Sequence, residues 1–169
     1  VQMGWIVREF AGLGAGVHYV RGNHKAVRDV YAPGSTFEIG RGNVVRPGDD
    51  VLVVSAGQLV SDALDAAEAL ADRGVSVEVV DMFCIKPLDE EIILSSAKKT
   101  GKVVTVEEHS VIGGLGSAVA EVLAGHNGAK FGMVGIEDKF GKSGKPDQLF
   151  EAYGLTAANV AAKAKELLK

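Results

Sequence analysis

Short apolar runs alternate with segments of helical periodicity along the last two-thirds of the chain. Residues 50–55 form a mostly apolar run, which is typical of a strand that is covered on both faces. Apolar residues then recur at helical spacing over 59–71, and acidic residues fall on the opposite side of that helix. Gly74 ends the predicted helix. The pattern therefore begins with a strand, a helix and a turn.

The same alternation continues to the end of the chain. Further strands are predicted over 75–80, 102–106 and 130–136, and further helices over 90–100, 117–123, 146–153 and 157–168. Asp89 and Thr156 are the expected N-caps of two of these helices. Residues 41–46 predict an additional strand at the edge of the sheet. Strands that alternate with helices in this way indicate βαβ units and a parallel sheet, which is an α/β fold.

Residues 1–35 follow a different pattern. A helix is expected over 2–11, with Trp5, Ile6 and Phe10 on its apolar side, and a strand over 17–21. A lone helix and strand cannot bury their apolar sides by themselves. We therefore interpret 1–35 as the tail of a preceding domain and a linker, and 36–169 as the domain proper.

The composition narrows the class of protein. The chain has 169 residues, 47% of them hydrophobic, and a net charge of −4, so nothing indicates a nucleic-acid surface. No apolar run approaches the roughly 18 residues of a membrane span, and no leader peptide is visible. A lone cysteine, Cys84, rules out an internal disulfide, and we expect it to be a small buried hydrophobic residue. Together these features favour the cytoplasm.

A glycine-rich turn follows the predicted strand 102–106 and opens a helix. Its candidate site residues are Glu107, Glu108, His109, Gly113, Gly114 and Gly116. The glycine amides could hold a phosphate, or the small residues could let strand and helix pack closely. The two glutamates would repel a phosphate, and the turn lacks the lysine of a P-loop and the full dinucleotide-binding spacing. The packing alternative is therefore favoured over nucleotide binding.

His109 also invites a catalytic interpretation, because imidazole titrates near neutrality and either glutamate could orient it. No credible nucleophile with suitable neighbours lies nearby in the sequence, so a capping or interface role is expected. Cys84 and the scattered histidines do not make a four-ligand zinc site, and no metal site is predicted. Residues 141–145 superficially resemble a phosphate loop but lack its spacing, and we interpret them as a loop at a subunit contact.

Several blocks together resemble the C-terminal domain of transketolases. They are residues 107–121 around the glycine turn, Phe37–Gly40, Ile85–Glu91, Phe140–Gly144 and Tyr153–Thr156. The resemblance is closest to bacterial and archaeal enzymes that are split into N- and C-terminal polypeptides. It implies a three-layer α/β/α domain with a five-stranded mixed, mostly parallel sheet. The segment 1–35 would then end the preceding pyrimidine-binding domain.

The resemblance also implies an activity for the whole enzyme. Transketolases use thiamine diphosphate and Mg²⁺ to move a two-carbon ketol unit between sugar phosphates, and they work as homodimers. The family's Gly-Asp-Gly metal motif is missing here, so we expect this chain to bind no cofactor and to be inactive alone. Its expected partner is the N-terminal, cofactor-binding portion of the same enzyme.

Arg21 is the residue expected to touch substrate. Tyr19–Asn23 resembles the end of the family's second domain, where an arginine binds the sugar phosphate, and a guanidinium fits phosphate oxygens bidentately. The residues Arg21–Asn23 also resemble deoxyxylulose-phosphate synthases, which have the same third domain but usually glycine in place of His109. A third alternative is the domain of 2-oxoacid dehydrogenase components that docks a lipoyl-bearing core, although Phe140–Gly144 favours transketolase.

Overall fold

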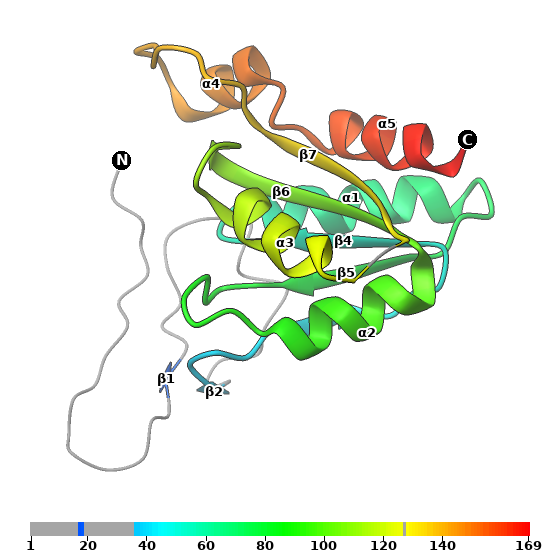
Figure 1. Cartoon of the computed structure of the whole chain (residues 1–169). Helices are drawn as coiled ribbons and strands as arrows, with labels where there is room; N and C mark the ends of the chain where they lie inside the picture. Colours follow the sequence, from blue (N-terminus) through cyan, green and yellow to red (C-terminus); the bar gives the residue numbers. More distant parts are fainter. Residues whose placement is uncertain (1–16, 19–35, 127) are drawn as a thin grey trace, which may run out of the picture.

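The computed structural model describes residues 17–18, 36–126 and 128–169. The predicted helix over 2–11, the linker and Arg21 lie outside these residues. Two short strands, β1 (Val17–His18) and β2 (Thr36–Phe37), pair antiparallel with each other. All other elements belong to one α/β unit built around a single larger sheet (Figure 1).

The larger sheet has five strands in the order β3-β5-β4-β6-β7. The strands are β3 (Asn43–Arg46), β4 (Val51–Ser55), β5 (Val77–Asp81), β6 (Lys102–Ser110) and β7 (Lys130–Ile136). β3 is antiparallel to β5, and the other neighbouring pairs are parallel. The predicted mixed, mostly parallel sheet with an edge strand before β4 is confirmed. β4 and β5 are buried along their whole lengths, as their valine-rich runs predict.

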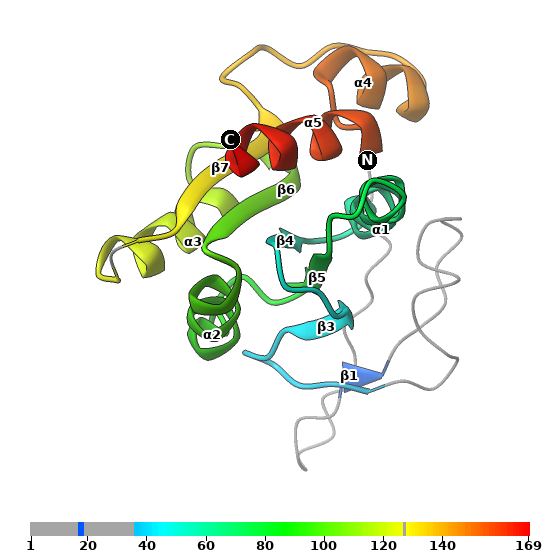
Figure 2. The same cartoon turned by 90° about the vertical axis from the view of Figure 1, so that its right-hand side faces the viewer.

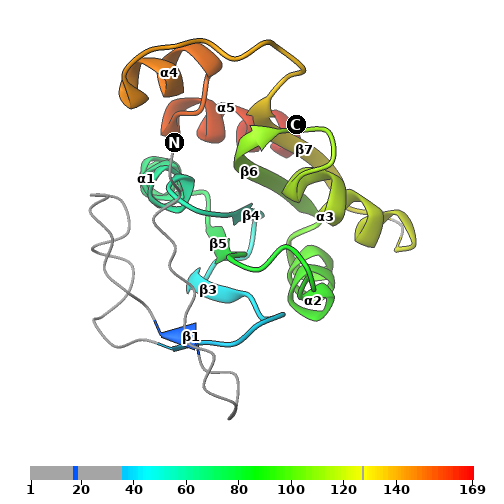
Figure 3. The same ribbon diagram turned by 90° about the vertical axis from the view of Figure 1, so that its left-hand side faces the viewer.

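Helices cover both faces of this sheet, as the views along its strands show (Figures 2 and 3). One face carries α1 (Leu59–Ala71) and α5 (Ala157–Leu168), which pack with Val51 and Val53 in one core cluster. The other face carries α2 (Glu90–Thr100) and α3 (Leu115–Ala124), with Leu52 and Val54 in a second cluster. Successive residues of a strand point to opposite faces, so the one apolar run of β4 supplies both cores. A further helix, α4 (Pro146–Tyr153), has no fully buried residue.

The helix ends follow the chemistry read from the sequence. Oδ1 of Asp89 accepts a hydrogen bond from the Ile92 amide at 3.2 Å, and Oγ1 of Thr156 accepts one from the Asn159 amide at 3.4 Å. α2 ends at Gly101, which adopts the left-handed backbone conformation with φ 65°. The predicted N-caps and the glycine that follows α2 are therefore confirmed.

The structure corrects three sequence predictions. β6 continues to Ser110, so Glu107, Glu108 and His109 lie within the strand rather than after it. α3 begins at Leu115, two residues before the predicted start. Cys84 is only half-buried, because it lies in the connection after β5 and not in a core cluster. Among the described helices, none is both long enough and apolar enough to cross a membrane.

Candidate functional site at the carboxyl end of the sheet

The order of the strands determines where a site is expected. After β4 the chain moves outward to β5 and then crosses back to β6 on the other side of β4. The connections that leave β4 and β6 therefore run to opposite faces of the sheet, and ligands of open α/β folds bind at such a point. Here the carboxyl ends of β4 and β6 place Ser55 and Gln58 beside Glu107 and Glu108.

Glu107 occupies the start of α3. Its side chain is 5% exposed, and its two oxygens accept hydrogen bonds from the amides of Leu115 at 2.7 Å and Gly116 at 2.8 Å. These amides belong to the first turn of the helix, which has no partners for them within the helix itself. A carboxylate at this end is also favoured by the helix dipole. The negative charge that a phosphate would bring is therefore already supplied by the chain.

The glycines of the turn make room for this carboxylate. A Cβ atom on Gly114 would meet Oε2 of Glu107, and one on Gly116 would lie 2.8 Å from Sδ of Met133. Gly113 has a φ of 77°, which disfavours side-chain-bearing residues, and its amide donates to Oγ of Ser117 at 2.8 Å. The turn is thus a closely packed connection between β6 and α3, as the packing alternative proposed.

His109 and Glu108 point to different neighbours. The imidazole of His109 is 63% exposed, and its Nδ1 lies 2.9 Å from the carbonyl oxygen of Ser110 and 3.9 Å from Oε2 of Glu107. A carbonyl oxygen can only accept a hydrogen bond, so the contact with Ser110 is a hydrogen bond in the tautomer that has its proton on Nδ1. Glu108 instead faces the switch point, where its Oε2 accepts a hydrogen bond of 3.2 Å from Nε2 of Gln58.

The arrangement has the properties of a structural junction. The described residues contain no group of three histidine, cysteine or acidic side chains that could hold a metal ion. The carboxylate at the helix start accepts hydrogen bonds from two backbone amides. Among the described residues, no hydrogen bond or ion pair joins Glu107 or His109 to a nucleophilic side chain. Both glutamates and His109 are thus brought to one end of the sheet together with the three glycines, whereas Arg21 lies outside the described residues.

Sequence reasoning missed two polar residues on the β4 side. The hydroxyl of Ser55, which is fully buried, donates to the Val106 carbonyl at 3.2 Å, and Gln58 bonds Glu108. Both contacts join residues about 50 positions apart in the chain, so no local pattern could reveal them. The available signal was the place of Gly57 and Gln58 directly after a buried strand and before a helix.

Comparison with known proteins identifies the domain. Residues 40–160 match the family described as transketolase, C-terminal domain. A transketolase C-terminal section from Methanocaldococcus jannaschii is 47% identical over 136 residues, which cover 80% of this chain and 42% of that protein. The 6-deoxy-6-sulfo-D-fructose transketolase subunit SqwH from Clostridium sp. is 42% identical over 149 residues, covering 88% of this chain and 46% of that one. A 1-deoxy-D-xylulose-5-phosphate synthase from Heliobacterium modesticaldum is 44% identical over 135 residues, covering 79% and 21%.

A solved structure agrees with these relatives. A split-gene transketolase in an inactive beta4 tetramer superimposes with a TM-score of 0.79 at 48% identity, and the match covers 83% of this chain and 46% of that one. The chain therefore spans less than half the length of the relatives and the solved chain that it matches. The family match, the relatives and the solved structure lead to one conclusion: the chain belongs to the transketolase C-terminal domain family.

Proposed function

We propose that this chain is the third, non-catalytic domain of a thiamine diphosphate-dependent transketolase, and that the N-terminal portion of the same enzyme binds the cofactor. The whole enzyme would transfer a two-carbon ketol unit between sugar phosphates in the cytoplasm, as a homodimer. The observation that carries the proposal is the match over residues 40–160, with relatives that are themselves a section or a subunit of a transketolase.

The described residues do not fit the cofactor. The diphosphate of thiamine diphosphate is held through a divalent metal, and the described residues offer no cluster of three acidic, histidine or cysteine ligands. The other place that attracts phosphate, the start of α3, carries the carboxylate of Glu107. On this proposal the cofactor and Mg²⁺ bind to the N-terminal portion of the enzyme, and this domain supports the dimer and the approach to the active site.

Two roles are assigned to particular residues. We propose that Arg21 binds the phosphate of the sugar substrate through the planar fork of its guanidinium. The second role is a loop or interface role for the glycine turn and the strand end before it. It is supported by the hydrogen bonds that fix this turn, and its residues are Glu107, Glu108, His109, Gly113, Gly114 and Gly116.

The role of Arg21 gives a prediction for the reconstituted enzyme. Arg21→Ala should raise the KM for the sugar phosphate much more than it lowers kcat.

The test is a ketol-transfer assay from xylulose 5-phosphate to ribose 5-phosphate with thiamine diphosphate and Mg²⁺. The chain is measured alone and together with the N-terminal portion of its parent enzyme. Activity only in the reconstituted sample is the expected result. Absence of activity in a reconstituted sample that is folded and associated would reject the proposed reaction, and thiamine diphosphate binding by this chain alone would reject its non-catalytic role.

A second candidate is the third domain of a 1-deoxy-D-xylulose-5-phosphate synthase. It is favoured by the 44% identity to the Heliobacterium modesticaldum enzyme and by the residues Arg21–Asn23. Formation of 1-deoxy-D-xylulose 5-phosphate by the reconstituted sample, without ketol transfer, would favour this candidate.

A further inference from the structure

The connection between β2 and β3 makes a turn beside the start of α2. The amide of Arg41 donates to the carbonyl of Glu38 at 3.1 Å, which closes this turn. Gly40 has a φ of 82°, and a Cβ atom there would lie 3.0 Å from Cγ of Pro87 in the connection before α2. A glycine therefore lets the turn lie against that connection. We call residues 38–42 the entry segment, because the chain passes through it into the five-stranded sheet.

Gly42 ends the entry segment against the core cluster under α2. A Cβ atom at this position would lie 3.0 Å from Cε of Met82, 3.3 Å from Cγ1 of Val80 and 3.4 Å from Cγ2 of Ile92. The amide of Gly42 donates a hydrogen bond of 3.0 Å to Oδ2 of Asp89, a residue that is 6% exposed. The backbone of the entry segment thus reaches both packed apolar side chains and a buried carboxylate.

The carboxylate of Asp89 bonds two separate segments of the chain. Its Oδ1 accepts from the amide of Ile92 in the first turn of α2, while its Oδ2 accepts from Gly42, 47 positions away. A helix cap needs only one side-chain oxygen, and the hydroxyl of Thr156 is sufficient for α5. The second oxygen of Asp89 is therefore not required by the cap, and it holds the entry segment.

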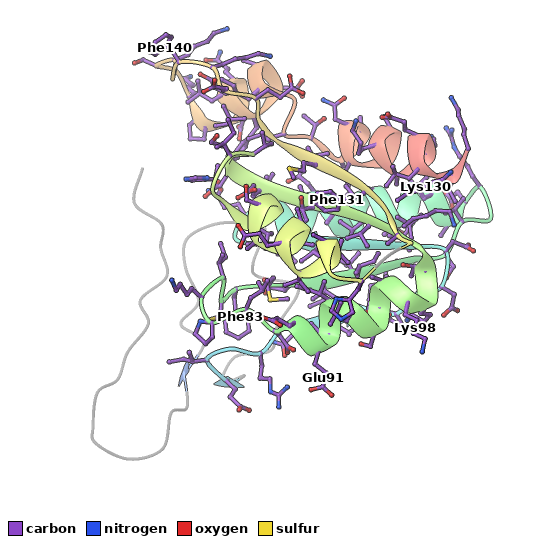
Figure 4. All side chains as sticks on the ribbon, in the orientation of Figure 1. Phe83, Glu91, Lys98, Lys130, Phe131 and Phe140 are labelled. Atoms are coloured by element: carbon purple, nitrogen blue, oxygen red, sulfur yellow. The ribbon has the colours of Figure 1, made fainter. Side chains whose placement is uncertain are left out.

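Arg41 adds an exposed ion pair at the same place. Its Nη1 lies 3.2 Å from Oε2 of Glu91 and 3.9 Å from Oδ1 of Asp89. Figure 4 shows Glu91 at the start of α2 with its side chain directed out of the molecule, where it is 84% exposed. Exposed ion pairs contribute little to stability. The buried carboxylate of Asp89 is therefore expected to hold the entry segment more strongly than the guanidinium does.

The strand that follows the entry segment provides few attachments of its own. β3 has four residues, lies at the edge of the sheet, and shifts its register against β5 between Val44 and Arg46. A short edge strand with irregular pairing opens more easily than a central strand. A link outside the strand pairing is therefore needed to hold the chain where it enters the sheet.

We infer that Asp89 is a positioning residue that joins the entry segment to the start of α2 and so fixes the path by which the chain enters the sheet. Loss of this link releases the entry segment while the sheet and α2 stay folded. On the proposed function, the residues before β2 end the preceding domain, so the same link fixes the direction in which that domain is attached. The link itself depends on neither the cofactor nor the reaction.

The experiment is amide hydrogen exchange of the full chain, followed by NMR at Gly42 and Ile92. Asp89→Ser keeps an oxygen that can cap α2 but shortens the side chain, whereas Asp89→Ala removes both acceptors. Exchange at Gly42 should become about tenfold faster or more in both variants, because a hydrogen bond to a buried charged group is lost. Exchange at Ile92 should rise by a similar factor only in Asp89→Ala. The amide of Val53 in β4 should stay strongly protected throughout, which separates local release from unfolding of the sheet.

Two further variants are matched controls. Thr156→Ala removes the side-chain cap of α5, and Arg41→Gln removes the exposed ion pairs but leaves Asp89 in place. Both should keep the exchange rate of Gly42 within about threefold of wild type. Trypsin cleavage of the Arg41–Gly42 bond, quantified by mass spectrometry, gives an independent measurement. Its initial rate should rise in Asp89→Ser and stay at the wild-type rate in Thr156→Ala. Circular dichroism melts establish that each variant is folded.

Four outcomes would overturn the inference. They are a Gly42 amide that is already unprotected in wild type, an Asp89→Ser protein in which Gly42 exchanges as in wild type, a Thr156→Ala protein in which Gly42 is accelerated equally, and an Asp89→Ser protein in which Ile92 is accelerated as much as Gly42. The last result would mean that α2 frays together with the entry segment. No arm measures ketol transfer, so a negative result here leaves the proposed function to its own assay.

Discussion

At the scale of single residues, the fit between Gly114 and Glu107 determines how β6 joins α3. A Cβ atom on Gly114 would overlap Oε2 of Glu107 and approach Nδ1 of His109. We expect Gly114→Ala to destabilise the fold by about 1–3 kcal/mol, because the carboxylate must leave the helix start or the turn must shift. The free energy of unfolding, measured with urea, checks this.

Gly125 is the control for this substitution. It ends α3 with φ −80°, and a Cβ atom there would meet nothing within 4 Å. Gly125→Ala should leave stability unchanged or raise it by up to about 1 kcal/mol, because alanine restricts the unfolded chain. Equal losses in the two alanine variants would show that Gly114 has no special role in the turn.

The carboxylate of Glu107 provides a second prediction. Glu107→Gln retains one acceptor oxygen, so one of the amides of Leu115 and Gly116 is left without its partner. A loss of about 1–3 kcal/mol in the free energy of unfolding is expected, since the site is buried. Glu108→Gln, at a half-buried position of the same strand, should cost less. A Glu107→Gln protein as stable as wild type would argue against the capping role.

At the scale of elements, the contact between α1 and α5 carries a pH-dependent group. Burial raises the pKa of the Asp62 carboxyl above its usual value of about 4, a hydrogen bond from the Ala157 amide opposes the rise, and Asp65 adds to it. The folded state therefore binds this proton more tightly than the unfolded state does. Wild type gains stability relative to Asp62→Asn as the pH falls from 7 through the raised pKa.

Urea unfolding of wild type and Asp62→Asn at several pH values between 7 and 4 checks this expectation. The advantage of the asparagine variant should be largest at neutral pH and shrink towards pH 4. Asp65→Asn removes the neighbouring negative charge, so the pKa of Asp62 should then lie closer to its usual value. In that background, the stability difference between aspartate and asparagine at position 62 should change over a narrower pH range. An advantage that stays constant or grows as the pH falls would contradict the assignment.

At the scale of the whole molecule, the sheet separates two cores. Leu70 belongs to the cluster under α1 and α5, and Ile93 to the cluster under α2 and α3. Leu70→Ala should cost about 2–5 kcal/mol and Ile93→Val about 0.5–1.5 kcal/mol. Because the two clusters lie on opposite faces, the loss in the free energy of unfolding of the double variant should equal the sum of the two single losses to within about 0.5 kcal/mol. A difference of more than about 1 kcal/mol between the double variant and that sum would mean that the sheet transmits strain from one core to the other.

The local pattern of the sequence was sufficient for the elements and the fold class. Valine-rich runs gave the buried strands, helical spacing gave the amphipathic helices, and Asp89, Thr156 and Gly101 marked helix ends correctly. These features depend on neighbours within a few positions, where side-chain periodicity and backbone capping act. The resemblance in several blocks predicted the mixed five-stranded sheet and the family, both of which are confirmed.

Only the tertiary structure decided how the glycine turn is used. Sequence reasoning treated Glu107 as a charge that would repel phosphate, whereas the structure places it in the strand and bonded to the helix start, eight and nine residues away. It ended β6 too early and placed Cys84 in the core, because neither apolar runs nor residue type reveals what later segments cover.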